Sequence, residues 1–197
     1  MISIYHQKIN DVWYAAAMEN DEVFATAFSP DEEEVLRHLL KNLPYNVPFQ
    51  VTEKPRQFLA ELLKTLEAIF DGKDVSLSSF KTAMDHLPSH TRTVLNCTSL
   101  IPVGYLTTYG AIAKVTGGSP RSVGRAEASN PFPLLIPCHR VVRSNFSIGG
   151  YGLGEKVKLQ ILQRENRRYE KTTTLRINDK ALPLFPIKHL RKNRGKN

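Results

Sequence analysis

The sequence predicts an α+β protein with two domains. Aromatic and β-branched residues flank a polar turn near the start of the chain, strong helical periodicity follows, and the balance of charge changes sign near residue 86. The 197 residues suffice for one large domain or for two small ones that each close a hydrophobic core. We therefore expect a strand hairpin with helices, followed by a mainly helical second domain.

The first half of the chain predicts one hairpin and two helices. Residues 12–18 and 22–28 are rich in aromatic and β-branched side chains and enclose a short polar turn, which is typical of a β-hairpin. Residues 31–43 begin with four acidic side chains, which stabilise a helix N-terminus, and continue with spaced leucines. Residues 56–70 repeat apolar side chains at intervals of three and four, so a second helix is predicted there.

The charge of the chain divides where this periodicity is lost. Residues 1–88 hold 8 Lys and Arg against 14 Asp and Glu, whereas residues 89–197 hold 19 against 5. We predict an acidic structural domain of residues 1–86, a second domain of residues 87–170 and a basic tail of residues 171–197. A basic half attracts polyanions, of which nucleic acid is the commonest inside cells, although surface charge can also serve solubility alone.

Two short helices joined by glycines are predicted in the basic half. Thr108 can cap a helix over residues 109–116, and Ser119 can cap the helix that follows the glycines. This arrangement is typical of a helix-turn-helix, although any small helical hairpin would give the same pattern. An earlier helix over residues 91–101 places Cys97 on its apolar face, where we expect a core residue and not a functional thiol.

Cys138 follows an apolar run and lies in a Pro-Cys-His-Arg sequence at residues 137–140. An imidazole and a guanidinium beside a thiol favour the thiolate, which is the nucleophilic form. A buried cysteine next to a solvated basic pair is the alternative interpretation of so short a sequence. Residues 154–167 predict a helix whose inward face can carry Lys158 and Glu165.

The Pro-Cys-His-Arg sequence resembles the active-site signature of the O6-alkylguanine-DNA alkyltransferases. Further sequences follow in the family's order and at nearly its spacing, namely Gly104–Ala113, Arg121–Gly124, Asn130-Pro131, Gly149–Gly152, Lys158 and Glu165. The resemblance covers residues 89–166 densely, is limited to layout in the first half and is absent after about residue 170. It implies a first domain with a ribonuclease H-like layout and a winged-helix-like second domain that binds DNA.

The resemblance also implies an activity. The alkyl group of O6-alkylguanine in DNA, and that of O4-alkylthymine, is transferred irreversibly to Cys138, so that the protein is consumed as a single-turnover methyltransferase. Double-stranded DNA is the expected partner, and nucleotide flipping brings the damaged base to the thiol. No cofactor is implied.

The catalytic roles follow from matching positions in the family signature. The resemblance implies that His139 is the base that acts on the thiol through a water molecule, and that Glu165 orients His139. It implies that Asn130 ties the turn around the cysteine and that Tyr109 donates toward guanine N3. Lys158 matches an active-site lysine.

The substrate pocket and the DNA surface are implied in the same way. Tyr151 walls the pocket, the carbonyl of Val141 reads the exocyclic amine, and Pro133 lies near the alkyl group. Gly152 stands where some relatives use serine, and its backbone N–H can still bind guanine O6. The expected DNA-binding residues lie on the two short helices and are Arg121, which fills the vacated stack, Ser122, Gly124, Arg125 and Thr108.

One loop departs from the family pattern. Residues 143–147 lack the glycine that is usual in this turn, which leaves the geometry of the wing open. Asn145 in this loop can tolerate a left-handed conformation.

The sequence further predicts an intracellular monomer without a metal. No apolar run reaches the ~18 to 20 residues that span a bilayer, and the first residues lack a secretory signal. We therefore expect a cytoplasmic or nuclear protein without a membrane partner, in which both cysteines stay reduced. The histidines outside the signature are scattered without ligand spacing, namely His6, His38, His86, His90 and His189.

Alternatives stay open for the function and for the tail. A noncatalytic, lesion-binding helix-turn-helix protein would need the basic half but not Cys138, and a cysteine hydrolase would use Cys138 and His139 with turnover. The tail from residue 171 can be a phosphate-contacting arm or a solubilising segment. Its apolar side chains indicate that part of it docks, namely Leu182, Leu184, Phe185, Ile187 and Leu190.

Overall fold

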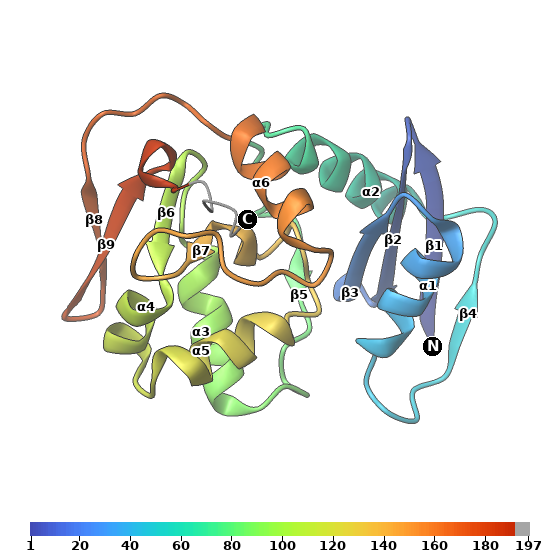
Figure 1. Cartoon of the computed structure of the whole chain (residues 1–197). Helices are drawn as coiled ribbons and strands as arrows, with labels where there is room; N and C mark the ends of the chain where they lie inside the picture. The colour runs from blue at the N-terminus through green and yellow to red at the C-terminus, as the bar shows by residue number, and fades with distance from the viewer. Residues whose placement is uncertain (192–197) are drawn as a thin grey trace, which may run out of the picture. The chain divides into compact units, whose positions relative to one another are not determined.

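The computed structural model describes residues 1–191, which divide into two units (Figure 1). The first unit holds Met1–Pro88 together with Asn130–Ile136, and the second holds Ser89–Ser129 and the chain from Pro137 onward. Each unit combines helices with a sheet, which confirms the α+β class predicted from the sequence. The sequence analysis places Asn130–Ile136 in the second domain, and the contacts of that segment explain the difference.

The first unit is built on a five-stranded sheet. Its elements are β1 (Ile2–Ile9), β2 (Val12–Glu19), β3 (Glu22–Ser29), α1 (Glu32–Lys41), β4 (Phe49–Val51), α2 (Gln57–Phe70) and β5 (Lys81–Thr82). The strand order is β4-β1-β2-β3-β5. Strands β1, β2 and β3 form an antiparallel meander, whereas β4 pairs in parallel with β1 and β5 pairs in parallel with β3.

The helices α1 and α2 cover opposite faces of this sheet, because successive strand residues point to opposite sides. Val35 and Leu39 of α1 pack in one core cluster with Ala15 of β2. Tyr14, the residue before that alanine, points the other way, and its ring centroid lies 6.3 Å from that of Phe70 in α2. Strands β2 and β3 are the predicted hairpin. Strand β1 is not predicted, because polar side chains interrupt its apolar alternation.

The segment Asn130–Ile136 folds with the first unit because it is bonded to β3. Thr26 donates its backbone N–H to the Pro131 carbonyl at 2.9 Å and its hydroxyl to the Pro133 carbonyl at 2.8 Å. These partners are more than a hundred residues apart in the sequence. Periodicity and local motifs carry no information about such a pairing.

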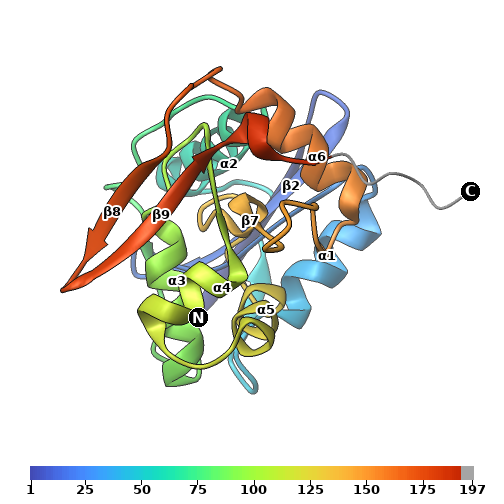
Figure 2. The same ribbon diagram turned by 60° about the vertical axis from the view of Figure 1, so that its left-hand side comes forward.

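The second unit joins a helix-turn-helix to a four-stranded sheet (Figure 2). Its elements are α3 (Ser89–Ser99), β6 (Tyr105–Thr108), α4 (Tyr109–Thr116), α5 (Pro120–Ala128), the short 3-10 helix η1 (Cys138–Arg140), β7 (Val141–Val142), α6 (Glu155–Arg164), β8 (Thr173–Ile177), β9 (Lys180–Pro186) and the 3-10 helix η2 (Ile187–His189). The strand order is β7-β6-β9-β8. One core cluster joins α3, α4 and α5 to β9 and includes Val94, Ile112, Val123, Leu182 and Leu184. A second cluster packs Leu162 of α6 against Leu106 of β6 and Val142 of β7.

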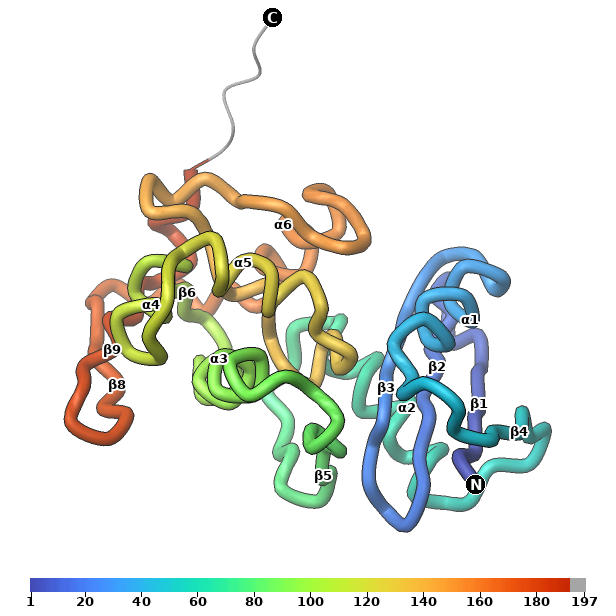
Figure 3. Tube along the Cα trace, turned by 90° about the horizontal axis from the view of Figure 1, so that it is seen from below, coloured from blue at the N-terminus to red at the C-terminus, as the bar shows by residue number. Residues whose placement is uncertain are grey.

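The helix-turn-helix begins its helices at the predicted caps. Thr108 Oγ1 accepts the Ala111 N–H at 3.1 Å, and Ser119 forms a capping box with Ser122. Gly117 has a φ of 86°, a left-handed value that glycine adopts without a Cβ clash. The chain therefore turns sharply from α4 into α5, as the tube in Figure 3 traces.

The chain after α6 remains folded through Arg191. Strands β8 and β9 form an antiparallel hairpin, and β9 pairs with β6. Leu182 and Leu184 of β9 are buried in the core, which confirms the predicted docking of these side chains. The last six residues of the predicted basic tail lie outside the described residues, and the two roles considered for the tail from residue 171 stay predictions.

Candidate active site

The cysteine of the Pro-Cys-His-Arg sequence opens the short helix η1. The carbonyl of Pro137 accepts the Arg140 N–H at 2.8 Å, which closes this single turn. Cys138 is 8% exposed, so most of its side chain is shielded from water. The following strand β7 pairs with β6 and fixes the turn to the sheet.

His139 and Arg140 both bind the carboxylate of Glu165, the C-cap residue of α6. His139 Nε2 lies 3.0 Å from Glu165 Oε1. Arg140 donates through Nε to Oε2 at 2.9 Å and through Nη2 to Oε1 at 2.7 Å, while its Nη1 donates to the Ile101 carbonyl at 2.5 Å. All three side chains of this cluster are buried. The family resemblance implies the contact of His139 with Glu165. The sequence analysis names the Arg140 guanidinium as a charge that favours the thiolate, but its contact with Glu165 is not predicted.

Burial and ion pairing together set the charges of this cluster. Burial acts to raise the pKa of Glu165, but His139 and the two-point contact with Arg140 outweigh it and hold the pKa at about 2. Burial also lowers the pKa of His139 by more than the Glu165 carboxylate raises it, so the imidazole is neutral near pH 7. A neutral imidazole that donates from Nε2 has an acceptor at Nδ1. His139 Nδ1 has no hydrogen-bond partner among the described residues.

Lys158 of α6 is fully buried beside these groups. Its Nζ donates to the Val141 carbonyl at 2.7 Å and to the Gly150 carbonyl at 3.3 Å, and it lies 5.8 Å from the centroid of the Tyr109 ring. Burial lowers the pKa of Lys158 to about 8, although negative charge on Cys138 acts in the other direction. The lysine therefore ties β7 to the loop before α6. The Val141 carbonyl keeps a second lone pair for another donor.

Tyr109 begins α4, and Tyr151 lies in the loop before α6. Burial raises the pKa of Tyr109 to about 12 and the pKa of Tyr151 well above its ordinary value, so both hydroxyls stay protonated and can donate. Gly149, with a φ of 71°, lies so close to Tyr109 that an added Cβ would come within 3.2 Å of the hydroxyl oxygen. An added Cβ at Gly152 would meet nothing within 4 Å, so a serine would fit there.

Asn130 and Pro133, two further predicted site residues, fold with the first unit. The side-chain amide of Asn130 donates to the Ile136 carbonyl at 3.0 Å, and its oxygen accepts the Phe132 N–H at 2.9 Å. Asn130 therefore ties the turn that leads along the chain to the cysteine. Pro133 is half-buried, and its carbonyl is the one that accepts the hydroxyl of Thr26.

The predicted DNA-binding residues differ in how accessible they are. Arg121 and Arg125 of α5 are exposed, and Gly124 has no atom within 4 Å of an added Cβ. Ser122 is engaged in the capping box, with its Oγ 3.2 Å from His90 Nε2. Thr108 caps α4. The two arginines and Gly124 are thus the open part of this helix surface.

The loop after β7 turns at Phe146, where φ is 62°. The left-handed conformation falls on Phe146 and not on Asn145, the residue that could tolerate it. Asn145 closes the turn with its side chain, because its Oδ1 accepts the N–H of Ser147 at 3.0 Å and the hydroxyl of Ser147 at 2.7 Å. The side-chain oxygen of Asn145 thus stabilises the turn, and the next residue, Phe146, takes the left-handed backbone conformation.

Glu127 is a buried acid near this site that the sequence analysis does not select. It is 7% exposed, Thr98 donates to its Oε1 at 2.5 Å, and its Oε2 has no hydrogen-bond partner among the described residues. Burial raises the pKa of Glu127 to about 7, against the opposing influence of Thr98 and Lys158. Its position four residues after the buried Val123 is the signal that could have placed it on the inward face of α5.

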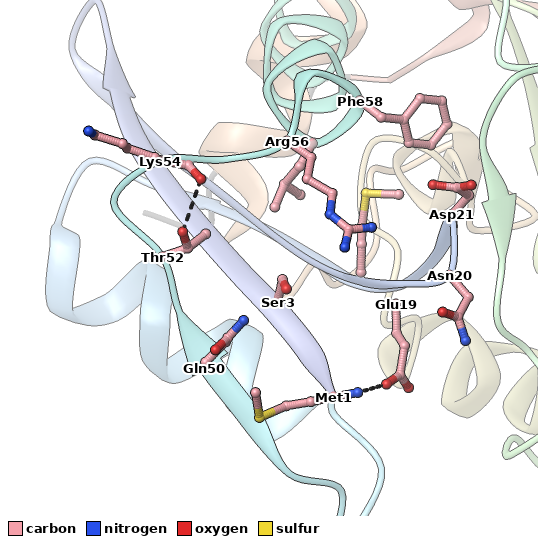
Figure 4. Close-up of a pocket in the computed structure, with 12 residues that line it drawn as sticks. Met1, Ser3, Glu19, Asn20, Asp21, Gln50, Thr52, Lys54, Arg56 and Phe58 are labelled. Carbon is pink, nitrogen blue, oxygen red and sulfur yellow. Dashed lines mark hydrogen bonds and ion pairs between the residues drawn. The ribbon is translucent and has the colours of Figure 1, made fainter.

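The remaining features of the described chain give no second candidate site. A cavity of about 340 Å³ in the first unit is lined by side chains of both charges and by none of the predicted site residues (Figure 4). Across residues 1–191, no group of three or more His, Cys, Asp or Glu could hold a metal ion. Within that same range, no helix is long and apolar enough to cross a membrane.

Comparison with known proteins assigns relatives to both units. The family model described as the 6-O-methylguanine DNA methyltransferase DNA-binding domain matches residues 89–167. A methylated-DNA–protein-cysteine methyltransferase of Methanocaldococcus vulcanius is 32% identical over 161 residues, which cover 80% of this chain and 94% of that protein. The enzyme of the same name from Methanothermobacter thermautotrophicus is 40% identical over 111 residues, or 56% of this chain.

Solved structures agree with these sequence matches. The crystal structure of O6-methylguanine-DNA methyltransferase from Pyrococcus kodakaraensis superposes with a TM-score of 0.64 at 25% identity, covering 84% of this chain and 99% of that one.

The match to the Methanothermobacter protein spans 63% of that protein's length, and matches to two other curated relatives span 44% and 60%. The chain thus spans less than two thirds of several of the relatives that it matches.

Proposed function

This chain belongs to the methylated-DNA–protein-cysteine methyltransferase family, and we propose that it repairs DNA by transferring the alkyl group of O6-alkylguanine to Cys138. The relative from Methanocaldococcus vulcanius, which matches over most of both chains, carries the family assignment. The structural observation that carries the proposal is the buried pair of Cys138 and His139, in which Glu165 binds one imidazole nitrogen and leaves the other as an acceptor.

The proposed reaction is a displacement at the alkyl carbon. The sulfur of Cys138 bonds to that carbon as the bond between the carbon and guanine O6 breaks, and the electron pair of that bond leaves with the base. Guanine regains a proton on its ring, and the thioether stays on the protein. Because nothing removes the thioether, each molecule reacts once. The alkyl group of O4-alkylthymine is bonded in the same way and is included as a substrate.

His139 is the proposed base in this reaction. Its Nδ1 can take the thiol proton through one water molecule, and the Glu165 carboxylate then stabilises the imidazolium. Arg140 supports this role because, together with His139, it outweighs burial and holds the pKa of Glu165 at about 2, so the carboxylate is charged at any working pH. Lys158, with a pKa of about 8, adds positive charge that favours the thiolate.

The flipped base is proposed to lie among groups on three segments of the chain. Tyr109 donates to guanine N3, and Tyr151 walls the pocket. The backbone N–H of Gly152 binds O6, and the second lone pair of the Val141 carbonyl accepts the exocyclic amine. Pro133 is proposed to lie near the alkyl group. The raised pKa of Tyr109, about 12, supports its role because the hydroxyl keeps the proton that it must donate.

The proposed partner is double-stranded DNA, bound by the protein as a monomer. The exposed Arg121 and Arg125 lie on a helix with small residues, which lets a phosphate backbone approach closely. Arg121 is proposed to fill the stack that the flipped nucleotide leaves. Since the substrate is cellular DNA, we place the reaction in the cytoplasm of a cell without a nucleus, or otherwise in the nucleus.

Intact-mass measurement after mixing with a duplex that contains O6-methylguanine tests the proposal. One added methyl group per protein is expected, on the peptide that contains Cys138, with no second turnover. Cys138→Ala should remove transfer and keep DNA binding, while Cys97→Ala, a change at the other buried thiol, should keep both. DNA binding without any transfer by the unaltered protein would support a noncatalytic lesion-binding protein instead, and turnover with excess lesion would support a hydrolase.

A second substrate separates the role of Arg121 from the chemistry. Flipping costs a few kcal/mol, which only a duplex requires. Arg121→Ala should therefore slow the reaction with the duplex by about a hundred-fold, equivalent to about 2.7 kcal/mol, and leave the reaction with free O6-benzylguanine nearly unchanged. An equal slowing of both substrates would show that Arg121 belongs to the pocket or to the fold.

A further inference from the structure

Phe146 holds a backbone conformation that its residue type disfavours. Its φ of 62° is left-handed, and a residue with a bulky side chain rarely adopts this region unless its surroundings enforce it. A glycine, which has no Cβ, would adopt this conformation without strain. Something in this chain must therefore hold Phe146 in place.

Residues of the C-terminal segment hold Phe146 in this conformation. The ring of Phe146 packs edge-on against Phe185 of β9, with 4.9 Å between centroids, and lies 5.7 Å from the ring of His189. Arg191 donates its backbone N–H to the Phe146 carbonyl at 2.9 Å and forms a β-bridge with Ser147. We call Phe185, His189 and Arg191 the C-terminal clamp. All three lie beyond residue 167, where the match to the family model ends.

The turn held by the clamp begins the loop of residues 143–152, which we call the substrate loop. At its far end, Lys158 binds the Gly150 carbonyl at 3.3 Å, and Gly149 lies against Tyr109. The loop is thus fixed at two points, the clamped turn and the contacts around Gly149. Tyr151 and Gly152, which follow directly, depend on both points for their position.

We propose that Phe146 and the C-terminal clamp are positioning elements that fix the substrate loop for alkyl transfer. This rests on the proposed function, because the positioned residues are those assigned to the flipped base. The contacts of His139 and Arg140 with Glu165 hold the short helix η1, which also contains Cys138, without using the clamp. Loss of the clamp should therefore affect use of the substrate and not the thiol itself.

Phe185→Ala removes the ring that contacts Phe146 and is the first test. The rate of reaction with free O6-benzylguanine should fall about ten-fold, which corresponds to about 1.4 kcal/mol, while alkylation of Cys138 by iodoacetamide stays at the rate of the unaltered protein. The matched control is Phe80→Ala, which truncates a half-buried phenylalanine of another aromatic pair, in the first unit. This control should react at the unaltered rate.

A rescue experiment separates positioning from general stability. Glycine at position 146 adopts a left-handed φ without a clamp, so Phe146→Gly should restore the rate in the Phe185→Ala background although the aromatic contact is still absent. The melting temperature of the double variant should stay below that of the unaltered protein. A rate that Phe185→Ala leaves unchanged, or that Phe146→Gly does not restore, overturns the proposal. His189→Ala replaces Phe185→Ala if the latter does not fold.

Hydrogen exchange keeps this test independent of the proposed function. If the unaltered protein transfers no alkyl group, the proposed function fails, and exchange at the amides of residues 143–152 still measures the hold of the clamp. Faster exchange there in Phe185→Ala than in Phe80→Ala supports the clamp. Equal exchange in the two variants overturns it.

Discussion

Two buried carboxyl groups in the second unit have opposite protonation behaviour. Glu165 is fully buried and its pKa is held at about 2, whereas Glu127 is 7% exposed and its pKa is raised to about 7. Burial acts in the same direction on both. The difference lies in their partners, since Glu165 receives two hydrogen bonds from Arg140 and a contact with His139, and Glu127 receives one from the neutral hydroxyl of Thr98.

The comparison shows that burial alone does not decide whether an acid in this core is charged. An imidazole and a two-point guanidinium together offset the loss of hydration at Glu165, whereas one hydroxyl and the more distant charge of Lys158 do not do so at Glu127. The charged acid is the one that supports the proposed base. Glu127 titrates near neutral pH and lies within the electrostatic reach of Cys97 on α3, Tyr109 on α4 and Lys158 on α6.

Removing the partner of the charged acid should give the largest effect. Arg140→Met leaves the Glu165 carboxylate buried without its cation, which typically costs about 3 to 5 kcal/mol of unfolding free energy. Urea unfolding at pH 7 measures the loss. Lys156→Ala, an exposed change on α6, is the control and should stay within about 0.5 kcal/mol. A loss in Arg140→Met as small as that of the control would mean that the ion pair contributes little.

The raised pKa of Glu127 should make the free energy of unfolding depend on pH. Because folding raises the pKa of Glu127 from an ordinary 4.5 to about 7, the folded protein binds this proton more tightly than the unfolded chain. The contribution of this proton to the free energy of unfolding is complete below about pH 4.5 and is lost as the pH rises to about 7. The free energy of unfolding should therefore decline by up to about 3 kcal/mol over this range.

Glu127→Gln removes this titration and should flatten that decline. Urea unfolding between pH 4.5 and pH 8 measures it, in a range where Glu165 stays charged because its pKa is about 2. The variant should match the unaltered protein at the acid end and exceed it at pH 8. Glu33→Gln, at an exposed position of α1, should leave the profile unchanged. A decline that persists in Glu127→Gln would assign the titration to another group.

The smallest effect is expected from the hydroxyl itself. Thr98→Val keeps the shape of the side chain and removes the donor to Glu127, so the pKa of Glu127 should rise further. The cost should be about 1.5 to 3 kcal/mol at pH 8, where the lost partner is a charged group, and about 1 kcal/mol at pH 5. Thr93→Val, an exposed change on the same helix, is the control. Equal losses at both pH values would contradict the assigned titration.

Much of the second unit could be predicted because its signals are local. The caps at Thr108 and Ser119 lie within three residues of the N–H groups that they accept, so the spacing alone identifies them. Cys97 was expected in the core from helical periodicity, and it is 3% exposed there. The contact of His139 with Glu165 was implied by the family signature, and the two side chains are 3.0 Å apart.

Other parts of the site could not be predicted, because their partners come from distant parts of the chain. Arg140 gains its importance only when Glu165, 25 residues later, folds back onto it. Phe146 and not Asn145 takes the left-handed conformation, and its ring meets Phe185 and His189 from a segment that the family resemblance does not reach. No spacing rule connects these positions.

The sequence by itself determined the helix caps, the core-facing sides of the helices and the order of the candidate catalytic residues, since each depends on neighbours within a turn or two of chain. The tertiary structure decided which buried groups are charged and which backbone turn is strained. Those properties depend on burial and on the charge of the nearest partner. Glu127 and Glu165 have the same side chain and are both buried, yet their pKa values are about 7 and about 2 because their partners differ.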